Sequence, residues 1–188
     1  MTDLMMDKSK LRKEILKQRQ ALSEREWQIK SNLICDRLKT FDLFEQANTV
    51  FAYFSFRQEV DLASLFSLNK RWAFPRCLNK SLVWHLWKIG EPLTKDKYGI
   101  QTPLETAPVV SVNRADLILV PTVACDHQGY RLGYGGGFYD RLLGSSQGSD
   151  VTTVGIVFDF AYVVQLPKDT WDIKLDFICT ETEIYLNK

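Results

Sequence analysis

The sequence predicts an α/β fold in three layers, with helices on both faces of one mostly parallel sheet. Short apolar runs such as 116–121 (DLILVP) are continuous rather than alternating, which is typical of strands buried on both faces. These runs are interleaved with stretches of helical periodicity, the order that βα units produce. The chain has 188 residues, of which 45% are hydrophobic, so we expect one domain over residues 1–188 with a single core.

The first element is a helix near residues 7–22, and its charged residues are unusual. On a helical wheel, one sector is apolar and should face the core; it holds Leu11, Ile15 and Leu22. The cations Lys8, Arg12 and Arg19 fall inside this sector. A cation on the core side costs free energy unless it is paired or meets an anion. The pattern therefore indicates either structural ion pairs and snorkelling stems or contacts with an anionic ligand.

The remaining elements follow from caps and apolar runs. A second helix begins at Ser23, because 23–26 (SERE) is a capping box, and it should extend to about Lys39. A short helix over 62–68 is capped by Asp61, and another helix covers 138–143. Strands are expected at 49–54, 71–75, 82–87, 116–121, 151–158 and 175–179.

Charge and cysteine content exclude several functional classes. The net charge is +1, so no global field favours nucleic acid or a membrane surface, although residues 1–39 hold 10 Lys/Arg against 6 Asp/Glu. The four cysteines are far apart without a CxxC pair, which argues against zinc and favours buried thiols in a reducing cytoplasm. The chain has no run of 18 apolar residues and no signal-peptide pattern. We therefore expect a cytoplasmic protein without nucleic-acid or membrane partners.

The glycine-rich segment 133–137 is the most informative feature. It follows a strand and a turn at 126–129 and precedes the helix at 138–143. Without Cβ atoms, its backbone N–H groups can form a nest for phosphate oxygens, and the helix N-terminus and Arg131 can add to it. The segment matches neither the Walker loop nor the dinucleotide fingerprint. The alternative is a tight strand-to-helix turn.

Three carboxylates extend this hypothesis. Asp140 lies in the first turn after the glycines and, with Asp172, could hold Mg²⁺ beside a polyphosphate. Asp140 could also simply complement the helix dipole. Glu59 follows the buried strand at 49–54, where α/β sheets bind ligands, and could accept hydrogen bonds from an aromatic ligand packed on Phe54. The alternative for Glu59 is a solvated loop carboxylate.

These motifs together resemble the 5-formyltetrahydrofolate cyclo-ligase family, also called methenyltetrahydrofolate synthetases. The match extends nearly end to end, and its motifs are 8–12 (KSKLR), 59–61 (EVD), 98–100 (YGI), 116–121 (DLILVP), 131–141 (RLGYGGGFYDR), 166–167 (LP), 171–172 (WD) and 180–181 (TE). The resemblance implies the three-layer fold shared with sugar-phosphate isomerases and CoA-transferase-like proteins. It also implies one catalytic domain over 1–188, acting as a monomer.

The resemblance implies ATP-dependent conversion of 5-formyltetrahydrofolate to 5,10-methenyltetrahydrofolate, with release of ADP and phosphate and with Mg²⁺ as cofactor. It implies that nucleotide contacts come from Lys8, Ser9, Lys10, Leu11, Arg12, Arg131, Leu132, Gly133, Tyr134, Gly135, Gly136, Gly137, Phe138 and Tyr139. Catalytic roles fall to Arg131 and Asp140, and metal ligation to Asp140 and Asp172. Substrate contacts fall to Phe54, Glu59 and Tyr98.

One position departs from the family pattern. Some members carry lysine where this chain has Gly136, so the phosphate charge must be met by Arg131, Lys8 or Arg12. Two other functions stay open: a non-catalytic protein that binds nucleotide and folate, and an enzyme like a sugar-phosphate isomerase, which would not need ATP.

Overall fold

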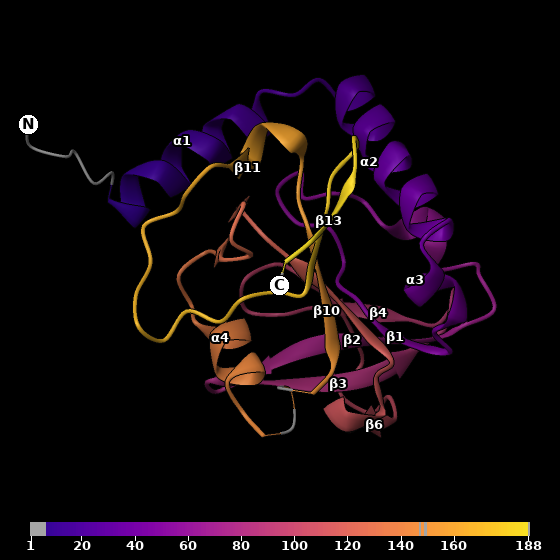
Figure 1. The fold of residues 1–188 in the computed structure, drawn as a ribbon. Helices are drawn as coiled ribbons and strands as arrows, with labels where there is room; N and C mark the ends of the chain where they lie inside the picture. Colours follow the sequence, from indigo (N-terminus) through magenta and orange to yellow (C-terminus); the bar gives the residue numbers. More distant parts are fainter. Residues whose placement is uncertain (1–6, 147, 149, 188) are drawn as a thin grey trace, which may run out of the picture.

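The computed structural model describes residues 7–146, 148 and 150–187, and Figure 1 shows their arrangement. Its α-helices are α1 (Lys8–Gln20), α2 (Glu24–Lys39), α3 (Asp42–Gln46) and α4 (Phe138–Leu143), and its 3₁₀ turns are η1 (Ala63–Leu65), η2 (Val112–Arg114) and η3 (Asp159–Ala161). Its strands are β1 (Thr49–Phe51), β2 (Arg71–Leu78), β3 (Ser81–Trp87), β4 (Leu93–Lys95), β5 (Gln101–Pro103), β6 (Val109–Val110), β7 (Leu117–Pro121), β8 (Ala124–Asp126), β9 (Arg131–Leu132), β10 (Thr152–Ile156), β11 (Tyr162–Val163), β12 (Phe177–Cys179) and β13 (Ile184–Leu186).

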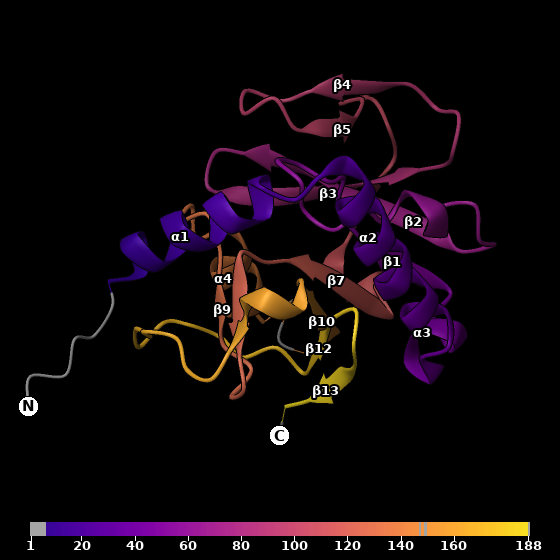
Figure 2. The same ribbon diagram turned by 90° about the horizontal axis from the view of Figure 1, so that it is seen from above.

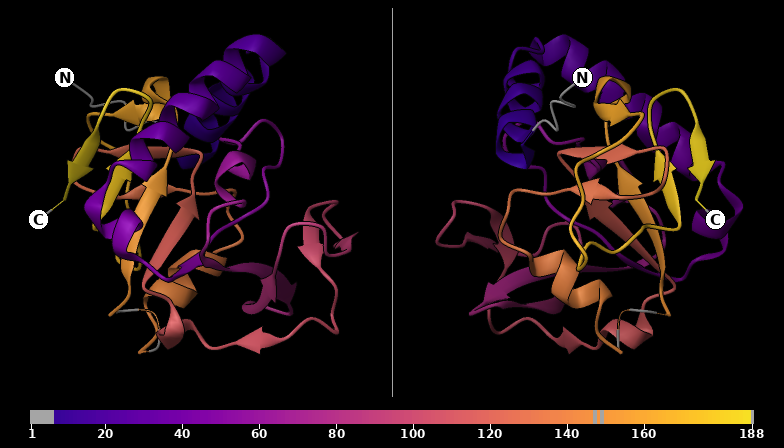
Figure 3. Two further views of the ribbon diagram at one scale, coloured as in Figure 1. Left: turned by 90° about the vertical axis from the view of Figure 1, so that its right-hand side faces the viewer. Right: turned by 60° about the vertical axis from the view of Figure 1, so that its left-hand side comes forward.

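The central sheet is mostly parallel, as the sequence predicts. Its eight strands lie in the order β13-β12-β10-β7-β1-β2-β3-β6. The pairs from β12 through β10, β7 and β1 to β2 are parallel, whereas β13, β3 and β6 pair antiparallel at the margins. The parallel strands β7 and β10 run towards α1 (Figure 3). The carboxyl ends of these strands, where α/β sheets bind ligands, therefore lie beneath the first helix.

Helices cover both faces of the sheet, which confirms the predicted three layers (Figures 1 and 2). Successive residues of β7 alternate between two cores: Leu117 and Leu119 belong to one, and Ile118 and Val120 to the other. The first core includes buried side chains of α2 and α3, and the second includes buried side chains of α1 and α4. A strand that is apolar on both sides reads as the continuous run seen in the sequence.

Local signals fix the helix ends. Asp7 caps α1 by accepting a hydrogen bond from the Ser9 backbone N–H, and the predicted capping box of Ser23 and Glu26 is present at α2. The short helix expected at 62–68 is wrong: Asp61 does accept from the Ala63 N–H, but the segment forms only the 3₁₀ turn η1. The first strand is also shorter than expected, because pairing ends at Phe51.

The strands expected at 71–75 and 82–87 are present as β2 and β3, which form a long hairpin. Several smaller elements escape the sequence patterns: β4 pairs with β5 in a separate layer (Figure 2), and β8 pairs with β9 and β11. These smaller strands have two or three residues each, so periodicity cannot identify them. The cysteines are free, as expected, and all but the partly exposed Cys77 are buried. Within the described ranges, no helix has the length and hydropathy needed to cross a bilayer.

Candidate functional site

The glycine loop connects β9 to α4 and has a fixed backbone. Gly135 and Gly137 have φ angles of 98° and 64°, in the region that side chains disfavour, so glycine is required at both. Arg141 donates from Nη2 to the carbonyl of Gly136 (2.8 Å) and from Nε to the carbonyl of Lys80 (2.7 Å). These bonds tie the loop to the β2–β3 hairpin. α4 itself has only six residues, so the loop's own N–H groups are its main anion-binding feature.

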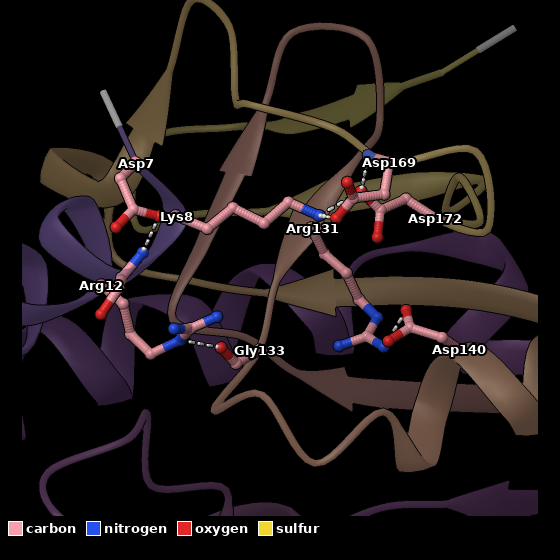
Figure 4. Close-up of polar contacts among 9 residues, drawn as sticks. Asp7, Lys8, Arg12, Arg131, Gly133, Asp140, Asp169 and Asp172 are labelled. Carbon is pink, nitrogen blue, oxygen red and sulfur yellow. Dashed lines mark hydrogen bonds and ion pairs between the residues drawn. The ribbon is translucent and has the colours of Figure 1, made fainter. Parts of the chain in front are cut away.

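The first helix lies against this loop. Arg12 donates from Nε to the carbonyl of Gly133 (2.7 Å), as Figure 4 shows. A Cβ atom placed on Gly135 would lie 3.8 Å from the Arg12 guanidinium, so the guanidinium extends along the glycine segment. Arg12 forms no ion pair with any described carboxylate. Its charge is therefore available for an anionic ligand of the loop, as the helical wheel suggested.

Lys8 connects the same helix to the loop at 166–172. Its Nζ pairs with Asp169 (2.7 Å) and Asp172 (2.6 Å), and Asp172 also accepts from the Asp169 backbone N–H (2.7 Å) (Figure 4). Burial by itself lowers the pKa of Lys8, but the hydrogen bonds and charges of the two aspartates outweigh it and raise this pKa. Lys8 therefore stays protonated and holds both carboxylates in place.

A further ion pair joins β9 to α4, at the two ends of the glycine loop. Arg131 donates from Nη2 to Asp140 Oδ1 at 2.6 Å, and the Arg131 side chain is buried. The Arg131 Nε and the Tyr139 hydroxyl are also buried, and neither has a hydrogen-bond partner among the described residues. The Arg131 guanidinium lies 5.5 Å from the centre of the Tyr139 ring. Buried polar groups without a hydrogen-bond partner are rare, and a catalytic role is one explanation for them.

The two carboxylates proposed as metal ligands are thus each held by a cation. No group of three or more metal-binding side chains occurs in the described part of the chain. Asp140 and Asp172 nevertheless supply the hard oxygen ligands that Mg²⁺ prefers, and Mg²⁺ usually takes one or two carboxylates with phosphate and water oxygens. The donor set therefore fits Mg²⁺ only together with a phosphorylated ligand.

Glu59 is buried rather than solvated, contrary to the alternative considered from the sequence. Its Oε2 accepts from the Phe56 backbone N–H (3.0 Å), and its backbone carbonyl accepts from the Trp27 indole N–H (2.8 Å). Burial raises the pKa of Glu59 to about 7, against the opposing effects of the Arg19 charge and hydrogen bonds from Phe56 and Tyr134. Glu59 therefore titrates near neutral pH, which is frequent at functional sites.

Phe54 lies beside Glu59 in sequence but faces an aromatic cluster. Its ring stacks on Phe74 with centroids 4.1 Å apart and meets Trp87 edge-on at 5.2 Å. An aromatic ligand at this point would extend an existing stack. Tyr98 lies elsewhere, in the β4–β5 turn: its side chain is exposed and interacts with Lys97, and the described residues show no contact between Tyr98 and Glu59 or Phe54.

The other residues expected to contact nucleotide lie in the first helix and in the glycine loop. Arg12 reaches the glycine loop and Lys8 reaches the loop at 166–172, whereas Ser9 and Lys10 are exposed on α1 and Leu11 packs in the core. In the loop itself, Tyr134 is exposed in part and Leu132 is buried in the core.

Three residues that were not among the predicted site residues also shape the site. Arg19 is 3% exposed and contacts both the glycine loop and the segment before Glu59. Asp169 pairs with Lys8, as Asp172 does, and Arg141 donates a hydrogen bond to a carbonyl of the glycine loop. Only Arg19 had a usable signal, its position in the apolar sector of the first helix. The other two depend on contacts between distant segments.

A parallel sheet with a cation-lined glycine loop near the carboxyl ends of its strands is typical of α/β proteins that bind a phosphorylated ligand. The chain belongs to the 5-formyltetrahydrofolate cyclo-ligase family, whose model matches residues 4–181. It is similar to 5-formyltetrahydrofolate cyclo-ligase of Escherichia coli (strain K12), with 30% identity over 186 residues, covering 91% of this chain and 98% of that protein. The corresponding protein of Haemophilus influenzae is 34% identical over 138 residues, covering 69% of this chain and 74% of that protein.

Two solved structures resemble this fold. The structure of Aquifex aeolicus 5,10-methenyltetrahydrofolate synthetase is similar with a TM-score of 0.86 and 34% identity, over 96% of this chain and 93% of that chain. A 5,10-methenyltetrahydrofolate synthetase from Mycoplasma pneumoniae has a TM-score of 0.73 at 24% identity, over 94% of this chain and 99% of that chain. The second likeness supports the fold alone.

Proposed function

We propose that the protein catalyses the ATP-dependent conversion of 5-formyltetrahydrofolate to 5,10-methenyltetrahydrofolate, with release of ADP and phosphate. One observation carries the proposal beyond family membership: the glycine loop is lined by Arg12 on one side, while Tyr134 of the same loop interacts with the buried Glu59. A triphosphate on the loop and a folate at Glu59 would then be neighbours. The active unit is one catalytic domain over 1–188, acting as a monomer in the cytoplasm.

The chemistry needs a phosphoryl transfer before ring closure. The γ-phosphoryl group moves from ATP to the formyl oxygen, which leaves ADP and gives an oxygen that can depart. N10 then attacks the formyl carbon and loses its proton, the C–O bond breaks, and phosphate leaves with the former formyl oxygen. Such transfers depend mainly on positioning and charge stabilisation, so cations matter more than a protein nucleophile.

Individual residues take roles from where they lie. Arg12 binds phosphate oxygens, because its charge is not paired and it lies along Gly133–Gly135. Glu59 accepts hydrogen bonds from the pterin ring, and Phe54 supports the ring by stacking. Arg12 thereby supplies the cationic charge that a loop lysine provides in some members of the family, where this chain has Gly136. Tyr98 would have to approach from the β4–β5 turn.

Mg²⁺ would be held by Asp140 and Asp172, and when bound it neutralises charge on the phosphate oxygens. Arg131 and Lys8 now hold these carboxylates, so they are freed to donate to phosphate oxygens when the carboxylates take the metal. The buried Arg131 Nε and Tyr139 hydroxyl are two further donors that have no partner among the described residues.

The activity is tested directly by mixing the purified protein with Mg²⁺, ATP and 5-formyltetrahydrofolate. We expect the near-ultraviolet absorbance of the methenyl product to rise, with one ADP formed per product. A folded protein that binds both ligands without this rise would be a non-catalytic binder. Turnover of a sugar phosphate without ATP would instead support the isomerase-like alternative.

Replacing Lys8 with alanine should weaken nucleotide binding. Lys8→Ala removes a cation and leaves Asp169 and Asp172 to repel each other and the phosphates. We expect the KM for ATP to rise about tenfold or more, since a hydrogen bond to a charged group contributes about 1.5–3 kcal/mol. Lys13→Ala, an exposed cation on the same helix, is the control and should leave this KM unchanged. If Lys8→Ala and Lys13→Ala have the same KM for ATP, Lys8 has only a structural role.

A further inference from the structure

Arg19 is a buried cation near the end of α1 that the roles above leave unexplained. It is 3% exposed, and in the described part of the chain its guanidinium forms no ion pair. It donates from Nε to the carbonyl of Arg57 (3.1 Å) and from Nη2 to the Tyr134 hydroxyl, and it lies 5.5 Å from the Tyr134 ring centre. A buried charge held only by neutral groups is costly, which favours a role beyond packing.

The two partners of Arg19 lie on different loops. Tyr134 belongs to the glycine loop, whereas Arg57 lies two residues before Glu59. Arg19 and Tyr134 also both act on Glu59: the Arg19 charge and the Tyr134 hydroxyl each lower the pKa of its carboxyl group, against the effect of burial. Among the described cations, Arg19 is therefore the one that contacts both the glycine loop and the segment before Glu59. A guanidinium suits this position, because its donors point in fixed, separate directions.

The segment before Glu59 is held in an unfavourable conformation. Arg57 and Gln58 have φ angles of 49° and 55°, in the left-handed region that non-glycine residues rarely occupy. Such residues persist only when surrounding contacts over-determine them. Two of these contacts come from the end of α1 and the turn after it: Arg19 binds the Arg57 carbonyl, and the Gln58 amide donates to the Leu22 carbonyl (3.2 Å). Arg19 thus helps to hold the segment that leads into Glu59.

We propose that Arg19 is a positioning residue that couples the binding of nucleotide and folate. The inference rests on the proposed function, since it takes the two loops as the sites of the two substrates. A triphosphate that orders the glycine loop fixes Tyr134, and through Arg19 and Tyr134 it fixes Glu59 for the folate. Linkage requires the same coupling in the other direction, so a bound folate strengthens nucleotide binding by the same factor.

The coupling is measured with two ligands that cannot react together. Calorimetry gives the Kd of a non-hydrolysable imido analogue of ATP with Mg²⁺, in the absence and presence of saturating 5-methyltetrahydrofolate, which has no formyl oxygen. The ratio of the two Kd values is the coupling factor. We expect about tenfold in the unaltered protein, within the usual range for coupled sites. If the unaltered protein binds neither ligand, the proposed function itself fails.

Variants then assign the coupling to Arg19. Arg19→Gln should bring the coupling factor close to one, and Arg19→Lys, which cannot span both loops, should restore little of it. Because Arg19 is buried, Tyr134→Phe provides a second test: it keeps the ring, removes only the hydroxyl, and should lower the factor in the same way. Lys13→Gln, an equal charge change on the exposed face of α1, should keep the original factor.

The separate Kd values show what each substitution does to affinity alone, whereas the ratio reports only the coupling. If Arg19 has a purely structural role, Arg19→Gln should weaken the binding of both ligands and leave the ratio of the Kd values unchanged. Folded Arg19→Gln and Tyr134→Phe proteins that keep the full coupling factor would overturn the inference. So would an unaltered protein that binds both ligands with a coupling factor of one.

Discussion

Asp140→Asn should lower the turnover number at least about a hundredfold while leaving the fold intact. The substitution removes the negative charge that pairs with Arg131 at 2.6 Å and removes a proposed Mg²⁺ ligand. Loss of one preorganised electrostatic partner at an active site typically costs 10²–10³-fold in rate. Asparagine can still accept a hydrogen bond from Arg131, so this buried cation keeps a partner and destabilisation should be modest. The measurement is the rate of methenyl formation at saturating ATP and folate, together with a melting curve.

A matched control separates the site from general charge loss. Asp36→Asn breaks an ion pair of similar length (2.9 Å to Lys39), but on the exposed surface of α2. It should leave both rate and melting temperature almost unchanged, because surface pairs contribute little. Raising the Mg²⁺ concentration should partly restore Asp140→Asn if the residue binds the metal. An Asp140→Asn protein with an unchanged rate would exclude Asp140 from catalysis and metal binding.

Glu59→Gln should stabilise the protein at alkaline pH and weaken folate binding. Burial raises the pKa of Glu59 to about 7, from an ordinary value of 4.5. Since the folded state binds the proton more tightly than the unfolded chain, this stabilisation is complete below about pH 4.5 and is lost as the pH rises to about 7. Above pH 7 the buried carboxylate is ionised, and the free energy of unfolding of the protein is then roughly 3 kcal/mol lower than with the protonated group.

Glutamine keeps the hydrogen bond from the Phe56 N–H but does not ionise. At pH 8 the melting temperature of Glu59→Gln should therefore exceed that of the unaltered protein, by an amount approaching roughly 6–12 °C. At pH 5 the difference should nearly disappear. The KM for 5-formyltetrahydrofolate should rise about tenfold or more, because a charged acceptor is lost.

Glu105→Gln is the control for this experiment, since Glu105 is exposed and lies far from Glu59 in the sequence. It should show neither the alkaline stabilisation nor the change in KM. A stability difference between Glu59→Gln and the unaltered protein that is the same at pH 5 and pH 8 would mean that Glu59 does not titrate in this range. A stabilised variant with an unchanged folate KM would leave Glu59 a structural carboxylate.

Much of the fold follows from local sequence. The continuous run at 116–121 reports burial on both faces of β7, and the capping box at Ser23 marks the start of α2. The short helix at 62–68 failed because one cap and a few apolar residues cannot stabilise a helix without a continuing periodic face. The strands β8, β9 and β11 are too short for a period, and only pairing partners far along the chain define them.

Some features of the candidate site also follow from local sequence, whereas others do not. Periodicity placed Lys8, Arg12 and Arg19 on the inner side of the first helix, and the glycines defined a loop with positive φ angles at Gly135 and Gly137. The sequence could not show that Arg12 reaches Gly133, 121 residues away, or that Lys8 bridges Asp169 and Asp172. It also left open whether Glu59 is solvated or buried, which decides its pKa.

By itself, the sequence determined the α/β class, the inner cations of the first helix and the position of a glycine loop whose backbone is free of side chains. These properties depend on residues within a few turns of helix or strand, so spacing and side-chain type record them directly. The tertiary structure alone decided which aspartate each cation meets, that Arg19 contacts two loops, and that Glu59 lies away from water. Such features depend on how sheet and helices bring distant segments together, and the desolvation and charge that result exist only in the packed molecule.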